Sequence, residues 1–299
     1  TDSAADASGI RVACVYSGLL GDKSYNDSCH EGLMKAQKDF GVEVKELEGT
    51  TADEWEANLL AVCEDGYDLV ICSSSNFEEY MKKYCASYPD VKFAVIDTTV
   101  EGDNIQSISF AQNQGSFLAG AAAAMFTTHD EIEGVNSDKI IGWVGGMDIP
   151  VLHDFFVGYE QGAAYADSSV KVETAYANTF EDEEAGKTCA KSLEAKNADI
   201  VFQVAGRAGN GVFQAAKEDG FYAIGVDQDQ KLTAKQYDDV ILCSVVKEVG
   251  KSLYDVVKAY VKNDTWEGGR IWKADMATGY ITLAYGDENS AQLISEDLK

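Results

Sequence analysis

The chain has 299 residues, of which 45% are hydrophobic and 10% are aromatic, and its formal net charge at pH 7 is −27. A chain of this length has room for two domains of ordinary size, each with its own core. The negative charge argues against binding to nucleic acid or to an anionic membrane surface, because phosphate groups would be repelled. The longest apolar stretch, at about 117–126, is too short to span a bilayer.

Residues 1–9 are small, polar and without a hydrophobic pattern, and we expect a flexible tether there. Cys14, Cys72 and Cys243 lie inside apolar strand patterns and are expected to be buried free thiols, whereas a disulfide among the other four cysteines remains open. No C-x-x-C motif occurs and the three histidines are scattered, so we expect no metal site and no cofactor.

The hydrophobic pattern of the first half predicts strands and helices in alternation, which is typical of α/β proteins with parallel sheets. The predicted strands are 11–17, 42–47, 69–72, 92–97 and 105–110, and the predicted helices are 28–40, 54–64, 77–87 and 112–128.

The same order then begins again. The second set has strands at 139–146, 170–176, 200–204 and 223–226 and helices at 153–166, 183–195 and 212–218, followed by a strand at 240–246, a helix at 249–261 and a strand-like tail at 281–285. Asp68 precedes Asp97 by 29 residues, and Asp199 precedes Asp227 by 28. We therefore predict two lobes of like build, with a cleft between them that closes over a ligand by a hinge motion.

The segment 198–230 reads as strand, glycine loop, helix and strand. Ligands of parallel sheets bind beyond the carboxyl ends of the strands. Phe202, Gly206 and Asp227 lie at those ends and offer a ring, an accessible backbone and a carboxylate, which predicts a small-molecule site. The glycine order G-x-x-G-x-G does not match the dinucleotide motif. The alternative, that these glycines only permit a turn, remains open.

Two further stretches could contribute to such a site. Tyr25, Asn26 and Asp27 follow the first strand and combine a stacking ring with hydrogen-bonding groups, although Asn26 or Asp27 could simply cap the next helix. Lys247 follows the strand at 240–246 and could donate to ligand hydroxyls and pair with Asp227, or could be solvated. Nothing in the sequence resembles a nucleophile with its base.

Five motifs in order resemble the basic membrane protein family, the purine-nucleoside-binding lipoproteins of bacterial ABC importers that are related to purine nucleoside receptor A. They are GDKSYND at 21–27, GSFLAG at 115–120, WVGGMDIPVLHDFFVGYEQGA at 143–163, VFQVAGRAGNGVF at 201–213 and IGVDQDQ at 224–230. The resemblance runs from about residue 10 to 286. It implies a type I periplasmic-binding-protein fold, with one lobe at 10–125 plus about 247–270 and the other at 126–246 plus about 271–299.

The resemblance implies that Tyr25 and Phe202 sandwich a purine ring, while Asn26 and Asp27 read its hydrogen-bonding edge. Tyr25 stands where phenylalanine is usual in the family, which keeps a stacking ring and adds a hydroxyl. Gln112 stands where an acidic residue is frequent, so the edge of the base that it reads is open.

For the ribose, the resemblance implies that Gly206, Asp227 and Lys247 hold the hydroxyl groups. An ionised acceptor makes the stronger hydrogen bonds, so a carboxylate facing two hydroxyls is sound chemistry. Arg207 replaces a small residue of the family and could stack on the ligand or bond to it.

These features predict an extracytoplasmic, lipid-anchored and monomeric receptor that captures a purine nucleoside (inosine, guanosine or adenosine) and delivers it to an ABC transporter permease. We do not expect an enzyme. One alternative is a receptor of the same fold for another small solute, such as a sugar or a signalling molecule. The other is a nucleoside-cleaving enzyme, which would need a general acid and base or a metal site.

Overall fold

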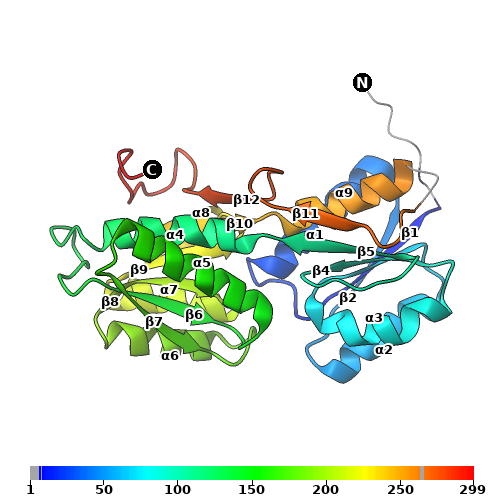
Figure 1. Ribbon diagram of the computed structural model, residues 1–299, viewed down its shortest axis with the longest axis horizontal. Coiled ribbons are helices and arrows are strands. Elements are labelled where there is room, and N and C mark those ends of the chain that lie inside the picture. Colours follow the sequence, from blue (N-terminus) through cyan, green and yellow to red (C-terminus); the bar gives the residue numbers. More distant parts are fainter. Residues whose placement is uncertain (1–6, 8, 263–265) are drawn as a thin grey trace. The chain divides into compact units, whose positions relative to one another are not determined.

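The computed structural model describes residue 7, residues 9–262 and residues 266–299, and its internal contacts divide the chain into two compact units (Figure 1). Unit 1 contains the described residues up to Gly21, together with Asn26–Phe110 and Glu248–Ala274. Unit 2 contains Asp22–Tyr25, Ala111–Lys247 and Asp275–Lys299. The division differs from the predicted boundaries, because residues 111–125 group with unit 2 and residues 271–274 with unit 1.

Unit 1 contains a six-stranded, fully parallel sheet in the order β11-β5-β4-β3-β1-β2. Its strands are β1 (Arg11–Val15), β2 (Glu43–Leu47), β3 (Leu69–Cys72), β4 (Lys92–Ile96), β5 (Ile105–Phe110) and β11 (Ile271–Ala274). Its α-helices are α1 (Tyr25–Phe40), α2 (Ala52–Glu64), α3 (Glu78–Tyr84) and α9 (Val249–Lys262), and short 3₁₀ turns flank α3. The sequence did not predict β11, an edge strand of four residues with only one buried side chain, because it shows no buried hydrophobic alternation.

Unit 2 contains a six-stranded sheet in the order β12-β10-β9-β8-β6-β7, in which only the edge strand β12 is antiparallel. Its strands are β6 (Ile140–Gly145), β7 (Lys171–Tyr176), β8 (Ala198–Val204), β9 (Tyr222–Asp227), β10 (Ile241–Lys247) and β12 (Ile281–Ala284). Its α-helices are α4 (Gln112–Phe126), α5 (Pro150–Ala166), α6 (Glu183–Glu194), α7 (Ala208–Asp219) and α8 (Gln230–Thr233).

The predicted internal repeat is confirmed. The two sheets have the same strand order when β1 to β5 are matched with β6 to β10, and they differ in the direction of the edge strand. Equivalent aspartates follow or end the equivalent strands β4 and β9, and both adopt the left-handed conformation, with φ of 65° at Asp97 and 67° at Asp227. The prediction of two α/β lobes with parallel-dominated sheets is therefore correct.

Three helices of the motif regions begin earlier than predicted. Helix α1 begins at Tyr25, α5 at Pro150 and α7 at Ala208. Pro150 has a preset φ and needs no N–H at a helix start, a signal that the prediction missed. As a result Asn26 and Asp27 lie in the first turn of α1, which excludes the alternative that either of them is its N-cap.

Several glycines of the motifs permit close helix packing. A Cβ atom at Gly162 of α5 would lie 1.9 Å from the carbonyl oxygen of Phe117 in α4 (helices that lie side by side in Figure 1), and one at Gly211 of α7 would lie 1.8 Å from the carbonyl oxygen of Glu183 in α6. Only Gly206 of the predicted glycine loop has a positive φ, of 55°. The alternative that these glycines only permit a turn therefore fits Gly206, whereas Gly211 permits the close packing of α7 on α6.

The terminal segment and the cysteines can be compared with their predictions. Most of the predicted tether at 1–9 lies outside the described residues, but Ala7 is buried and its N–H donates to the carbonyl oxygen of Phe40 over 3.1 Å. All seven cysteines lie in the described part and are free thiols, and Cys14, Cys72 and Cys243 are buried as predicted. None of the helices in this part of the chain has the length and apolar character needed to cross a membrane.

Candidate functional site

The carboxyl ends of β8, β9 and β10 gather the predicted site residues of unit 2. Gly206 follows β8, Asp227 ends β9 and Lys247 ends β10. In the β9–β10 pairing Val246 lies opposite Asp227, so Lys247 is one position further along the neighbouring strand. Asp227 is 6% exposed and Lys247 is 1% exposed. The sequence thus correctly placed an acid and a base at adjacent strand ends.

Asp227 is oriented by the segment Asp22–Tyr25, which the contacts assign to unit 2. The hydroxyl of Ser24 donates to Oδ2 of Asp227, and both side chains are buried. A non-glycine residue at positive φ is uncommon, although aspartate tolerates it better than most residues. The left-handed backbone and the Ser24 hydroxyl together fix where the Asp227 carboxylate points.

Two aromatic rings flank the Lys247 ammonium group. Nζ lies 5.5 Å from the ring centroid of Tyr25 and 5.5 Å from that of Phe155 in α5. Rings at this distance attract a cation through their quadrupole. Tyr25, Asp227 and Lys247, which are predicted from three distant stretches of sequence, are therefore brought into one cluster within unit 2.

Phe202 does not belong to this cluster in the way that the sequence suggested. Its side chain is fully buried in the core of unit 2, where its ring centroid lies 5.2 Å from that of Tyr159 and 6.5 Å from that of Phe155. Side chains alternate along β8, so Phe202 points to the face covered by α4 and α5, together with Ile200 and Val204. Its placement gives no support to a stacking role.

Phe180, which sequence reasoning missed, is the aromatic residue beside the strand ends. Its ring lies over the end of β6, because a Cβ atom at Gly146 would be 2.3 Å from its Cδ1, and its carbonyl oxygen faces Gly206 and accepts from the N–H of Ala208 over 3.0 Å. β6 pairs with both β7 and β8, so the chain reverses its strand order here. Such a switch point is the common ligand position in α/β sheets. Gly146 and Gly206 both lie against Phe180, but these contacts form only in the folded chain and leave no signal in the sequence.

Gln112 begins α4, and its amide is fixed by a carboxylate. Nε2 donates to Oδ2 of Asp154 over 2.7 Å, while Oε1 is buried without a hydrogen-bond partner in the described residues. The side chain is 6% exposed. An unsatisfied buried acceptor is costly and calls for an N–H or O–H donor. The start of α4 therefore presents a neutral, buried acceptor.

Asn26 and Asp27 belong to unit 1, in the first turn of α1. Nδ2 of Asn26 donates to the carbonyl oxygen of Leu19 over 3.3 Å, and Oδ1 of Asp27 accepts from the N–H of Gly21 over 2.6 Å. These bonds hold the loop that precedes α1. Both residues thus make local contacts. Their role in reading a base stays a prediction.

Arg207 is paired within the protein. Its Nε lies 3.4 Å from Oε2 of Glu181, the residue after Phe180, and both side chains are about 30% exposed. The ion pair links the loop after β8 to the loop after β7. A bond between Arg207 and a ligand, as the sequence suggested, would therefore compete with the ion pair to Glu181.

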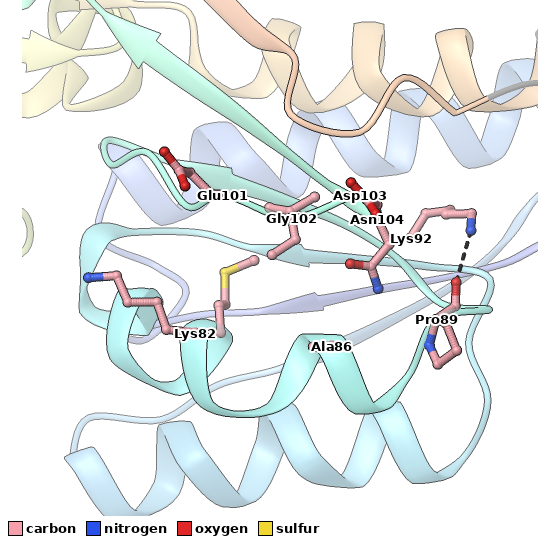
Figure 2. Close-up of a pocket in the computed structure, with 10 residues that line it drawn as sticks. Lys82, Ala86, Pro89, Lys92, Glu101, Gly102, Asp103 and Asn104 are labelled. Atoms are coloured by element: carbon pink, nitrogen blue, oxygen red, sulfur yellow. Dashed lines mark hydrogen bonds between the residues drawn. The ribbon is translucent and has the colours of Figure 1, made fainter.

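A cavity of about 350 Å³ lies elsewhere, on unit 1, between α3 and the loop at 101–105. Figure 2 shows Lys82 and Glu101 toward one end of it, and Lys92 donating to the carbonyl oxygen of Pro89 at the other. Nδ2 of Asn104 lies within hydrogen-bond distance of three backbone carbonyl oxygens, which marks that side chain as structural. None of the predicted site residues lines this cavity.

Comparisons with known proteins show which family the chain resembles. A family model described as "ABC transporter substrate-binding protein PnrA-like" matches residues 10–299. The chain is 32% identical to basic membrane protein B of Borrelia garinii subsp. bavariensis over 93% of this chain and 82% of that protein, and 29% identical to the ABC transporter nucleoside-binding protein BmpA of Lactococcus lactis subsp. cremoris over 91% and 80%. A crystal structure of a solute-binding protein of an ABC transporter system from Aeropyrum pernix K1 aligns with a TM-score of 0.85 and 28% identity, over 94% of this chain and 77% of that one.

Proposed function

Since the chain belongs to the family of PnrA-like substrate-binding proteins of ABC transporters, we propose that it captures a purine nucleoside and delivers it to a transporter permease. The nucleoside-binding name of the Lactococcus relative supports this ligand class. Substrate-binding proteins of ABC transporters work outside the cytoplasm. The proposal includes attachment to the membrane by a lipid and action as a monomer.

The observation that carries the proposal is the cluster in which the buried side chains of Asp227 and Lys247 lie with the half-buried Tyr25. A carboxylate accepts from vicinal hydroxyls, and a neighbouring ammonium group offsets its charge and donates to the hydroxyl oxygens. A ring beside the two charges offers a flat apolar face for a base. Ribose joined to a purine presents both kinds of surface in one molecule.

For the base, we propose stacking on Tyr25 and on Phe180, which replaces Phe202 in this role because Phe202 is a core residue. The buried oxygen of Gln112 suits an N–H donor on the edge of the base. Inosine and guanosine carry such a donor at N1, and adenosine carries one on its amino group. Asn26 and Asp27 stay proposed readers of the same base.

We further propose that binding is not followed by cleavage, since the relatives are binding proteins. Incubation of the protein with inosine, followed by chromatography for hypoxanthine, tests this part. Release of free base at a rate proportional to the protein concentration would identify a nucleoside-cleaving enzyme instead.

The decisive experiment compares ligands with and without ribose hydroxyls. The variant Asp227→Asn keeps a side chain that tolerates positive φ but removes the charge, and we expect it to weaken inosine binding by about 1.5–3 kcal/mol. The loss should be much smaller for 2′,3′-dideoxyinosine, which has no vicinal hydroxyls. Titration calorimetry measures both affinities.

The exposed Asp239→Asn in the same unit is the matched control and should bind inosine like the wild type. Equal losses for the two ligands in Asp227→Asn would mean that Asp227 acts only through the fold. Absence of binding of inosine, guanosine and adenosine by the wild-type protein would reject the nucleoside proposal as a whole.

A further inference from the structure

The segment Asp22–Tyr25 is held by unit 2, although the residues on both sides of it belong to unit 1. We infer that Gln230, which no ligand needs to touch, is the positioning residue that fastens this segment and so places Ser24 and Tyr25 beside Asp227 and Lys247. The inference rests on the proposed function for its effect on ligand affinity. The fastening itself stands on the contacts described next.

Gln230 is fully buried, and both the oxygen and the nitrogen of its carboxamide form hydrogen bonds. Oε1 accepts from the N–H of Val226 over 2.8 Å and from Nε2 of Gln203 over 2.7 Å. Nε2 donates to the carbonyl oxygen of Lys23 over 2.9 Å. Because the Val226 N–H can only donate, the amide has one orientation, and its donor end is directed at the segment.

Gln203 continues this chain of hydrogen bonds to the loop after β8. Its Oε1 accepts from the N–H of Ala205 over 3.2 Å, which leaves Nε2 for Gln230. The direction is therefore fixed by a backbone donor at Ala205 and a backbone acceptor at Lys23. Buried polar networks in which every group is satisfied specify one arrangement, because any alternative leaves an unpaired group.

The receiving carbonyl belongs to a residue with a strained backbone. Lys23 has a φ of 57°, and its carbonyl oxygen accepts from Thr233 Oγ1 over 3.3 Å in addition to Gln230. A non-glycine residue keeps such a conformation only where its surroundings impose it. Nδ2 of Asn210 adds a longer bond of 3.4 Å to the carbonyl oxygen of Asp22. These contacts determine where the chain enters α1 at Tyr25.

The substitution Gln230→Met tests this role with little change of volume. Methionine has no N–H to donate, so the Lys23 carbonyl oxygen loses its bond to residue 230. We expect inosine affinity to fall by about 10- to 100-fold, the range for a buried polar group left without its partner. Hydrogen exchange of the ligand-free protein should become faster in peptides covering 21–27. The exposed Gln236→Met, which makes the same substitution elsewhere in unit 2, should alter neither quantity.

A double-mutant cycle with Tyr25→Ala separates positioning from a general structural effect. If Gln230 acts by placing Tyr25, then Gln230→Met costs much less affinity in the Tyr25→Ala background than in the wild type. Should Gln230→Met fail to fold, Thr233→Val removes the second donor to Lys23 and is expected to speed exchange at 21–27 by a smaller factor.

Wild-type exchange at 21–27 in both variants, or fully additive losses in the cycle, would overturn the inference. Failure of the wild-type protein to bind any nucleoside would reject the proposed function alone, because exchange in the ligand-free protein still decides whether Gln230 fastens the segment.

Discussion

The carboxyl group of Asp199, at the start of β8, is buried in the interior of unit 2. Burial raises its pKa to about 6, although the Thr127 hydroxyl and the Asn136 N–H donate to it. A folded-state pKa above the unfolded value contributes stability that is present below the unfolded pKa and is lost as pH rises through the folded one. The window therefore runs from about pH 4 to about pH 6.

The variant Asp199→Asn removes this pH dependence and keeps an oxygen for Thr127. Relative to the wild type, we expect its free energy of unfolding to rise by about 1–3 kcal/mol between pH 4 and pH 7, since one pKa unit corresponds to about 1.4 kcal/mol. Urea unfolding at a series of pH values measures the difference. The exposed Asp130→Asn should show no such trend, and a constant difference between Asp199→Asn and wild type would contradict the assignment.

Phe180 and Phe202 offer a second comparison between single residues. Phe202→Ala removes a fully buried ring and should lower the free energy of unfolding by about 3–5 kcal/mol. Phe180→Ala, at a half-buried position, should cost little stability but weaken nucleoside binding by about 1–3 kcal/mol through lost stacking. Thermal unfolding and calorimetry at a temperature where both variants are folded separate the effects. Normal affinity in Phe180→Ala together with a loss in folded Phe202→Ala would restore the original prediction.

Whether the place of a residue could be predicted depends on whether local sequence or tertiary structure determines it. The positions of Asp227 and Lys247 at strand ends were predictable, because strand ends are visible in the hydrophobic pattern. The burial of Phe202 in the core could not be predicted, because an aromatic residue near a strand end looks the same in sequence whether its ring faces the core or the edge. The anchoring role of Gln230 could not be predicted, since Gln203 and Lys23 meet it only through tertiary structure.

At the scale of elements, the close packing of α4 against α5 depends on glycine residues of α5. Gly158 and Gly162 face the carbonyl oxygens of Asn113 and Phe117, at distances that leave no room for a Cβ atom. Gly162→Ala must push the two helix backbones apart, so we expect a loss of about 1–3 kcal/mol, the typical cost of overpacking, despite the better helix propensity of alanine. Chemical denaturation measures it.

The neighbouring Gln161→Ala is the control for this pair of helices. Gln161 is exposed on α5, so the variant should stay within about 0.5 kcal/mol of the wild type. A Gly162→Ala protein as stable as the wild type would show that the helices can separate without cost. The hydrophobic period predicted both helices. The role of their glycines in close packing could not be predicted, because it depends on which helix lies opposite.

At the scale of the whole molecule, the repeat was predictable because its strand spacing is regular, whereas the division into units was not. Each sheet's fifth strand is followed by a helix that belongs to the other unit, since α4 follows β5 and groups with unit 2, and α9 follows β10 and groups with unit 1. A sequence pattern reports where a helix is, but not which sheet it covers. The predicted boundary near residue 125 therefore fell after α4 instead of before it.

This exchange of helices has a consequence for how the chain is made. The ribosome releases the first five strands of unit 1 well before α9, yet α1 needs α9, because the N–H of Gly250 donates to the Ser28 hydroxyl across 222 residues of sequence. Contacts of such long range form slowly and late. Unit 1 therefore cannot complete the packing around α1 until α9 has been synthesised.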